Sequence, residues 1–235
     1  ADETRRAATT AEVETIPGLF ARAARACMEA GFDGAEVHGA HGFFFNQFFS
    51  PQANKRDDKY GGSLENRMRL GVDTVRAMRQ AVRPDFLVAY RHTPKEYIEG
   101  GYSLEESQLF VPELQRAGLN IIDVSPSTAP EPAKHAGLAA AIKEAVSIPV
   151  IAVGGMNDPA VAEATLAEKQ AHLVAIGRGL IADPNWPIKV REGRENEIVE
   201  CTEDNEKCYG NLSKGIPISC TQNPRAGFEY EDHEK

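Results

Sequence analysis

Two histidines, His38 and His41, lie three residues apart, directly after a short strand-like stretch at residues 35–37. Side chains at the carboxyl end of a barrel-type strand lie where such folds place their chemistry. Imidazoles there can donate hydrogen bonds to a carbonyl or phenolate oxygen and stabilise its negative charge. A zinc site is the alternative, with Asp33 and Glu36 nearby, but no further histidine completes a familiar zinc spacing. We favour the oxyanion role.

Two pairs of residues that suit an anion follow neighbouring predicted strands. Gly154 and Gly155 end the stretch 148–153, and Gly177 and Arg178 end the stretch 173–176. Glycines let the backbone N–H groups approach an anion closely, and a following helix N-terminus favours negative charge. Barrels frequently bind phosphate after their last two strands. We therefore predict a phosphate site, the alternative being that these glycines only turn the chain.

Arg91 ends another predicted strand, at residues 86–91. An arginine at a barrel mouth can stabilise an electron-rich ring edge, such as that of a reduced flavin. A structural salt bridge explains the same residue equally well, so the sequence leaves both interpretations open.

Three of the four cysteines gather near the C-terminus, at Cys201, Cys208 and Cys220, while Cys27 lies in a helical pattern typical of a small buried apolar residue. In an intracellular chain such a cluster indicates metal binding more than disulfides. Asp204 lies between the first two cysteines of the cluster.

Strands and helices alternate along the chain. Apolar runs predict strands at 35–38, 86–91, 120–124, 148–153 and 173–176, with helices between them and a long polar loop from the histidines to residue 63. Continuous apolar strands that alternate with helices indicate a parallel sheet covered by helices. A closed (β/α)8 TIM barrel needs eight strands. The sequence predicts an α/β fold of TIM-barrel type with only the last five βα units at residues 1–195, followed by a cysteine-containing extension at residues 196–235.

Composition narrows the classes of function. The chain has 235 residues, 42% of them apolar, and a net charge of −9. An acidic chain is a poor partner for nucleic acid or an anionic membrane. No apolar run approaches the roughly 18 residues of a membrane helix, and residues 1–15 contain no apolar signal region. We expect a cytoplasmic protein that acts on a small molecule.

Several stretches also resemble one known family, the old yellow enzyme superfamily of NADH:flavin oxidoreductases. The chain is most similar to its iron–sulfur branch, which includes 2,4-dienoyl-CoA reductase and trimethylamine dehydrogenase. The matching stretches are GFDGAEVHGAHG, QFFSPQANKRDDKYGGSLENR, IPVIAVGGMNDP, AIGRGLIADPNWP and SCTQNPRAG.

This resemblance implies non-covalent FMN and hydride transfer from NAD(P)H through the flavin to an activated alkene, or amine oxidation as in the dehydrogenase sub-branch. It implies that His38 and His41 hold the substrate oxygen and that Arg91 contacts the flavin ring. It places the phosphate at Gly155, Gly177 and Arg178. It also implies a [4Fe–4S] cluster on Cys201, Cys208 and Cys220.

The chain departs from the pattern of this family at three points. Phe43 stands where the family has a tyrosine that donates a proton. Asp204 stands in place of the second cluster cysteine, and a carboxylate binds iron less well than a thiolate. The early strands, which supply flavin contacts, and the C-terminal nucleotide-binding domains of the branch have no counterpart in the sequence.

Two other functions remain open. The chain could be a flavin-free half-barrel subunit, completed by a partner chain or a missing segment, that catalyses nothing itself. It could also be a phosphate-binding aldolase or isomerase, which would need a Schiff-base lysine or a metal-binding carboxylate at a strand end. Asp123 is the only strand-end carboxylate in the predicted strands, and no lysine qualifies.

Overall fold

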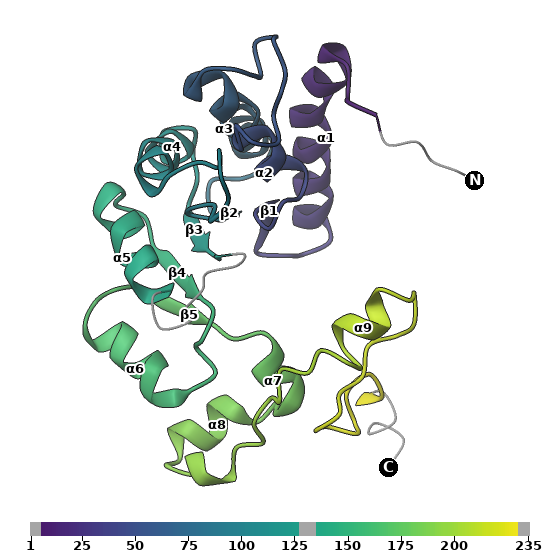
Figure 1. Cartoon of the computed structure of the whole chain (residues 1–235), viewed down its shortest axis with the longest axis vertical. Coiled ribbons are helices and arrows are strands. Elements are labelled where there is room, and N and C mark those ends of the chain that lie inside the picture. Colours follow the sequence, from purple (N-terminus) through teal and green to yellow (C-terminus); the bar gives the residue numbers. More distant parts are fainter. Residues whose placement is uncertain (1–5, 127–134, 230–235) are drawn as a thin grey trace. The chain divides into compact units, whose positions relative to one another are not determined.

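Five strands form one sheet in chain order, β1-β2-β3-β4-β5 (Figure 1). The computed structural model describes residues 6–126 and 135–229. The strands are β1 (Gly34–Gly39), β2 (Leu87–His92), β3 (Ile121–Val124), β4 (Val150–Val153) and β5 (Leu173–Ala175), and the pairs from β1 to β4 are parallel. All five predicted strands are confirmed, with ends that lie within two residues of the predictions.

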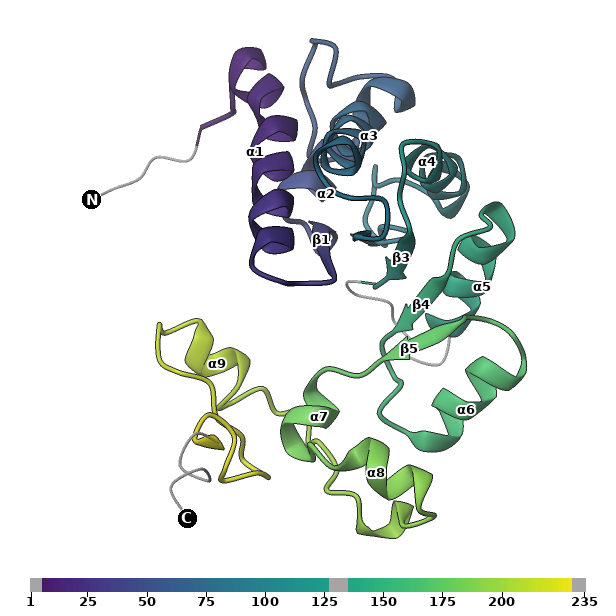
Figure 2. The same cartoon turned by 180° about the vertical axis from the view of Figure 1, so that it is seen from behind.

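A helix follows or precedes each strand, and successive helices pack side by side along one face of the sheet (Figure 2). These are α1 (Thr10–Glu29), α3 (Leu64–Ala81), α4 (Leu104–Arg116) and α5 (His135–Ala145), and α6 (Pro159–Ala167) precedes β5. The chain starts α1 and α4 with capping boxes, in which Thr9 and Ser103 exchange hydrogen bonds with Glu12 and Glu106. This is the parallel α/β order that the sequence predicts.

The core lies between this sheet face and the helices. Alternate residues of β1 to β4 point into it, and Val37, Val88, Tyr90, Ile122 and Val150 are at most 1% exposed. The remaining strand residues point to the opposite face. That alternation decides which strand side chains are left available for chemistry.

The buried Tyr90 ring fixes the end of β1. A side-chain Cβ built on Gly39 would lie 2.2 Å from that ring, so only glycine fits there. Gly71 of α3 makes a similar space for the hydroxyl of Tyr90, 3.3 Å from its own ideal Cβ. These two glycines let β1 and α3 close around one aromatic side chain immediately beside His38.

The chain divides into two compact units. Unit 1 comprises Ala1–Gly154 and Thr165–Val174, and unit 2 comprises Gly155–Ala164 and Ala175–Lys235. Unit 2 holds the short helices α7 (Arg178–Ala182), α8 (Trp186–Arg191) and α9 (Tyr209–Leu212) and the 3-10 helix η2 (Glu195–Glu197). The predicted domain boundary near residue 195 stays a prediction.

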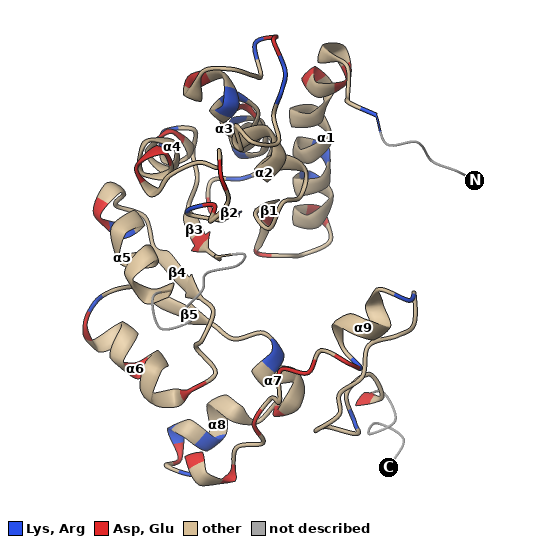
Figure 3. Ribbon diagram, viewed as in Figure 1, with Lys and Arg blue, Asp and Glu red and all other residues tan. Residues whose placement is uncertain are grey.

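Neither the acidic nor the basic residues are confined to one part of the chain. Acidic and basic residues are scattered over the helices and loops (Figure 3). A short helix, α2 (Phe44–Phe49), interrupts the stretch predicted as loop. Among the described residues, the helices are too short or too polar to cross a membrane.

Candidate active site

Three chemically active side chains form a row across the first three strands. His38 of β1 is the register partner of Arg91 on β2, and Arg91 is the register partner of Asp123 on β3. Register partners in a parallel sheet point to the same face, here the one opposite the helix-covered core. The sequence predicts His38 and Arg91 as site residues, and the structure brings them together.

Arg91 and Asp123 form an ion pair, with 3.1 Å between Nε and Oδ2. The Asp123 side chain is 8% exposed and that of Arg91 is 29% exposed. Burial raises the pKa of Asp123 to about 6, although Arg91 opposes this rise. The two terminal nitrogens of Arg91 donate no hydrogen bond to any residue within 6–126 and 135–229. The salt bridge and a free guanidinium edge thus coexist on one residue.

His41 is held at the strand ends by a network of backbone and hydroxyl groups. It has a positive φ of 61°, and its backbone N–H donates to Oγ1 of Thr93 at 3.0 Å. The Thr93 hydroxyl donates in turn to the carbonyl oxygen of Ser125 at 3.2 Å. The Oγ of Ser125 lies 2.9 Å from Nε2 of His41. Buried Thr93 and Ser125, which no sequence motif identifies, therefore orient this imidazole.

The imidazoles of His38 and His41 lie edge to face. Their ring centres are 5.3 Å apart. Burial lowers the pKa of both histidines, and the positive charge of Arg91 lowers it further. Both side chains are thus neutral at pH 7, which leaves each with one N–H to donate and one nitrogen to accept.

Phe43 lies at the position where a proton donor would be expected. Its ring is 59% exposed, and its centre is 5.1 Å from that of His38. The ring covers one side of the imidazole but has no exchangeable proton. The amide of Asn46 supports the turn that carries Phe43, since its Oδ1 accepts from the N–H of Gly42 at 2.6 Å.

The predicted phosphate residues fall on both sides of the boundary between the units. Gly154 has a positive φ of 98°, and an ideal Cβ on it would lie 2.1 Å from Nδ1 of His135. Gly154 belongs to unit 1, whereas Gly155, Gly177 and Arg178 belong to unit 2. In unit 2, Arg178 contacts the cysteine-bearing segment: Nη1 donates to Oδ1 of Asn205 at 3.1 Å.

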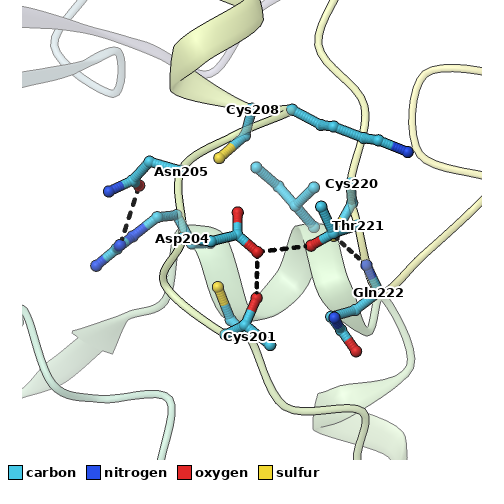
Figure 4. A pocket seen from close by; sticks show the side chains of 11 residues that line it. Cys201, Asp204, Asn205, Cys208, Cys220, Thr221 and Gln222 are labelled. Atoms are coloured by element: carbon cyan, nitrogen blue, oxygen red, sulfur yellow. Dashed lines mark hydrogen bonds between the residues drawn. The ribbon is translucent and has the colours of Figure 1, made fainter.

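The three C-terminal cysteines line one small pocket in unit 2 (Figure 4). Cys201, Cys208 and Cys220 lie around it together with Asp204 and Arg178, and all four cysteines of the chain are unpaired thiols. Within the described part of the chain, no group of three or more His, Cys, Asp or Glu side chains is arranged to hold a metal ion. The zinc alternative for His38 and His41 gains no support from the structure.

A larger cavity of about 700 Å³ lies elsewhere in unit 1. It is lined by residues 6–10 and 53–58 together with Phe44, Gln47 and Phe48. Arg56 and Asp58 shape one wall, because they bond the carbonyl of Ala8 and the hydroxyl of Thr10. No residue predicted from the sequence as a site residue lines this cavity.

Comparisons with known proteins show which family the sequence resembles. Residues 1–197 match the sequence profile of the NADH:flavin oxidoreductase / NADH oxidase family. An NADH oxidase from Thermoanaerobacter brockii is 43% identical over 233 residues, which cover 94% of this chain and 36% of that protein.

Solved structures give the same result. The complex of 2-naphthoyl-CoA reductase with 2-naphthoyl-CoA superposes with a TM-score of 0.91 at 32% identity and covers 96% of this chain and 36% of that one. Histamine dehydrogenase from Rhizobium sp. 4-9 has a TM-score of 0.82 at 33% identity, with 95% and 34% covered. The chain thus has the fold of part of such an enzyme and spans about a third of the length of these relatives.

Proposed function

The chain belongs to the NADH:flavin oxidoreductase / NADH oxidase family, and from this premise we propose that the full-length protein is an FMN-dependent oxidoreductase of ene-reductase type. Its reductant is NADH or NADPH, and its substrate is a small molecule with an activated alkene. FMN, when bound, supplies the centre that accepts and returns hydride.

The row of His38, Arg91 and Asp123 is the observation that carries this proposal. Asp123 holds Arg91 by Nε, which leaves the terminal nitrogens to donate to the electron-rich oxygen and nitrogen edge of a flavin ring. Held there, Arg91 would place a fixed positive charge where a bound flavin becomes electron-rich on reduction.

The neutral imidazoles suit the substrate end of the reaction. His41, fixed through Ser125 and Thr93, and His38 beside it can each donate one hydrogen bond to a substrate carbonyl oxygen. Those bonds strengthen as the oxygen gains negative charge, which is the condition for catalysis rather than binding alone.

We assign the phosphate of FMN to Gly155, Gly177 and Arg178, which all belong to unit 2. Gly155 has a positive φ of 75°, and an ideal Cβ on Gly177 would meet no atom within 4 Å. Open backbone of this kind admits an anion to the N–H groups. The remaining strands of the barrel come from a segment of the protein beyond this sequence or from a partner chain.

The visible absorption spectrum of the purified full-length protein tests the flavin. We expect flavin bands that bleach when NADH or NADPH is added without oxygen, and FMN released on denaturation. A folded protein that stays colourless after incubation with FMN would contradict the proposal and favour the flavin-free subunit.

Phenol binding tests the histidines. A phenolate mimics the charged substrate oxygen, so His41→Ala should weaken its binding about tenfold or more while flavin is retained. Phe44→Leu is the matched control, because this exposed neighbour has no hydrogen-bonding group, and its phenol affinity should stay unchanged. Equal affinity in His41→Ala and the wild type would remove His41 from the site.

Amine oxidation is the second candidate, and Phe43 favours it. A side chain without an exchangeable proton cannot protonate a reduced alkene, whereas oxidation of an amine needs no such donor. Histamine dehydrogenase, one of the similar structures, is named for this chemistry.

A further inference from the structure

Asp204 lines the small pocket in unit 2 together with the three C-terminal cysteines. The pocket has a volume of about 20 Å³, and three thiols and this carboxylate lie around it. The resemblance to the iron–sulfur branch implies a [4Fe–4S] cluster here, which needs four ligands that point to one centre. The fit therefore depends on where the carboxylate in the fourth position points.

Hydrogen bonds already engage both oxygens of the Asp204 carboxylate. Oδ2 accepts from the hydroxyls of Thr202 at 2.5 Å and Thr221 at 2.8 Å. Oδ1 accepts from the backbone N–H of Glu206 at 2.8 Å. Figure 4 shows the carboxylate directed to Thr221 and lying between Cys201 and Cys208.

The bond to Thr221 joins two segments of the chain. Asp204 lies beside Cys201 and Cys208 in sequence, whereas Thr221 follows Cys220 directly. This side chain thus adds a link between the two cysteine-bearing segments, beside the backbone bond from the N–H of Ser219 to the carbonyl of Lys207 at 3.0 Å. The donor set does not fit a [4Fe–4S] cluster, because its hard, hydrogen-bonded oxygen replaces a soft thiolate.

We propose that this pocket takes up no [4Fe–4S] cluster and that Asp204 instead connects its two segments as a hydrogen-bonded structural centre. The contacts of Asp204 support this proposal independently of the proposed flavin chemistry. The protein can therefore bind FMN whether or not this inference holds.

Iron and sulfide content tests the first half. The full-length protein, incubated with ferrous iron and sulfide under anaerobic conditions, should retain less than about one iron atom per chain, whereas Asp204→Cys should retain about four with broad visible absorption. Glu206→Cys is the matched control, since it adds a thiol at an exposed position two residues away, and should behave as the wild type.

Each other outcome overturns the inference. About three or four iron atoms in the wild type would mean that the cluster forms despite the carboxylate. A folded Asp204→Cys protein without iron would mean that Asp204 is not what excludes the cluster. Equal uptake by Glu206→Cys would mean that position 204 is not special.

Hydrogen exchange tests the second half without any metal. The amide of Glu206 donates to Asp204, so Asp204→Ala should speed its exchange, and Glu206→Gln, which keeps the acceptor, should not. Thr221→Val should loosen the same segment, because it removes the hydrogen bond by which Asp204 joins the two stretches. Unchanged exchange in both Asp204→Ala and Thr221→Val would show that the carboxylate holds nothing together.

Discussion

Arg91 and Asp123 form an ion pair across neighbouring strands in which the burial of the acid outweighs the attraction of the base. The pKa of Asp123 stands at about 6 instead of 3.8, with burial as the largest cause. The pair therefore holds Arg91 in place but does so with a carboxyl group that resists ionisation.

This relationship predicts a pH dependence of stability. An acid whose pKa is higher in the folded than in the unfolded state costs stability as pH rises from about 4 to about 6. A shift of about two units corresponds to at most about 3 kcal/mol at pH 7. Urea unfolding of Asp123→Asn at several pH values should lack this decline.

Asp85→Asn is the control for Asp123, because its side chain is 75% exposed and its replacement should leave the decline in place. Arg91→Met should raise the pKa of Asp123 further, since Arg91 lowers it, as carboxyl NMR titration can show. A pKa of Asp123 that falls in Arg91→Met would contradict this account.

The buried His92 predicts a loss of stability as the pH falls, opposite in direction to the effect of Asp123. This buried histidine has its pKa lowered to about 3 by burial, and its Nε2 lies 2.8 Å from Oγ of Ser107. The unfolded chain therefore takes up the proton first, and stability falls as pH drops below about 6.5, by about 2 kcal/mol at pH 5.

In His92→Gln, the free energy of unfolding should fall less steeply as the pH is lowered from 7 to 5. Ser107→Ala should lower stability at every pH and keep the slope, because His92 is still buried. A slope shared by His92→Gln and the wild type would assign the acid sensitivity to another group.

Phe43→Tyr predicts a gain of activity. The hydroxyl would stand beside His38 and supply the missing proton, and general acid catalysis typically contributes a hundredfold or more, so an increase of roughly tenfold in alkene reduction is a cautious expectation. Stopped-flow measurement of the oxidative half-reaction checks it, with reduction by NADH unchanged. Phe44→Tyr, one residue further on, should bring no gain, and equal gains in both variants would argue against the position of Phe43.

Gly154→Ala predicts a loss of stability. A positive φ costs an L-residue about 1–2 kcal/mol, and here the new Cβ would also meet the His135 ring at 2.1 Å. Gly100→Ala is the matched control, because Gly100 has a φ of 73° and nothing within 4 Å of its ideal Cβ. The midpoint of thermal unfolding should be lower for Gly154→Ala than for Gly100→Ala. The reverse order would mean that the His135 ring moves aside at little cost.

The sequence was sufficient for the elements with a clear period or cap. Apolar runs with helices between them predict the parallel α/β order that the structure shows, and residues 9–12 and 103–106 have the capping-box pattern of its helix starts. Helix α2 escaped prediction because six residues, four of them phenylalanine, are too few to display a helical period. Its buried side chains Phe45, Phe48 and Phe49 fold by contact with the core instead.

The candidate site was predicted only where strand ends mark it. His38 and Arg91 are recognisable because each ends an apolar run, but their alignment with Asp123 depends on strand register, which single strands do not encode. Thr93 and Ser125 act through hydrogen bonds between loops distant in sequence, and a lone hydroxyl residue gives no sequence signal.

The contact between Gly39 and the ring of Tyr90 limits how this protein can evolve. Any side chain at position 39 would collide with the aromatic ring, so a mutation there survives only after residue 90 has become smaller. We therefore expect the amino acids at positions 39 and 90 to covary among homologues, so that a residue larger than glycine at position 39 occurs together with a smaller residue at position 90.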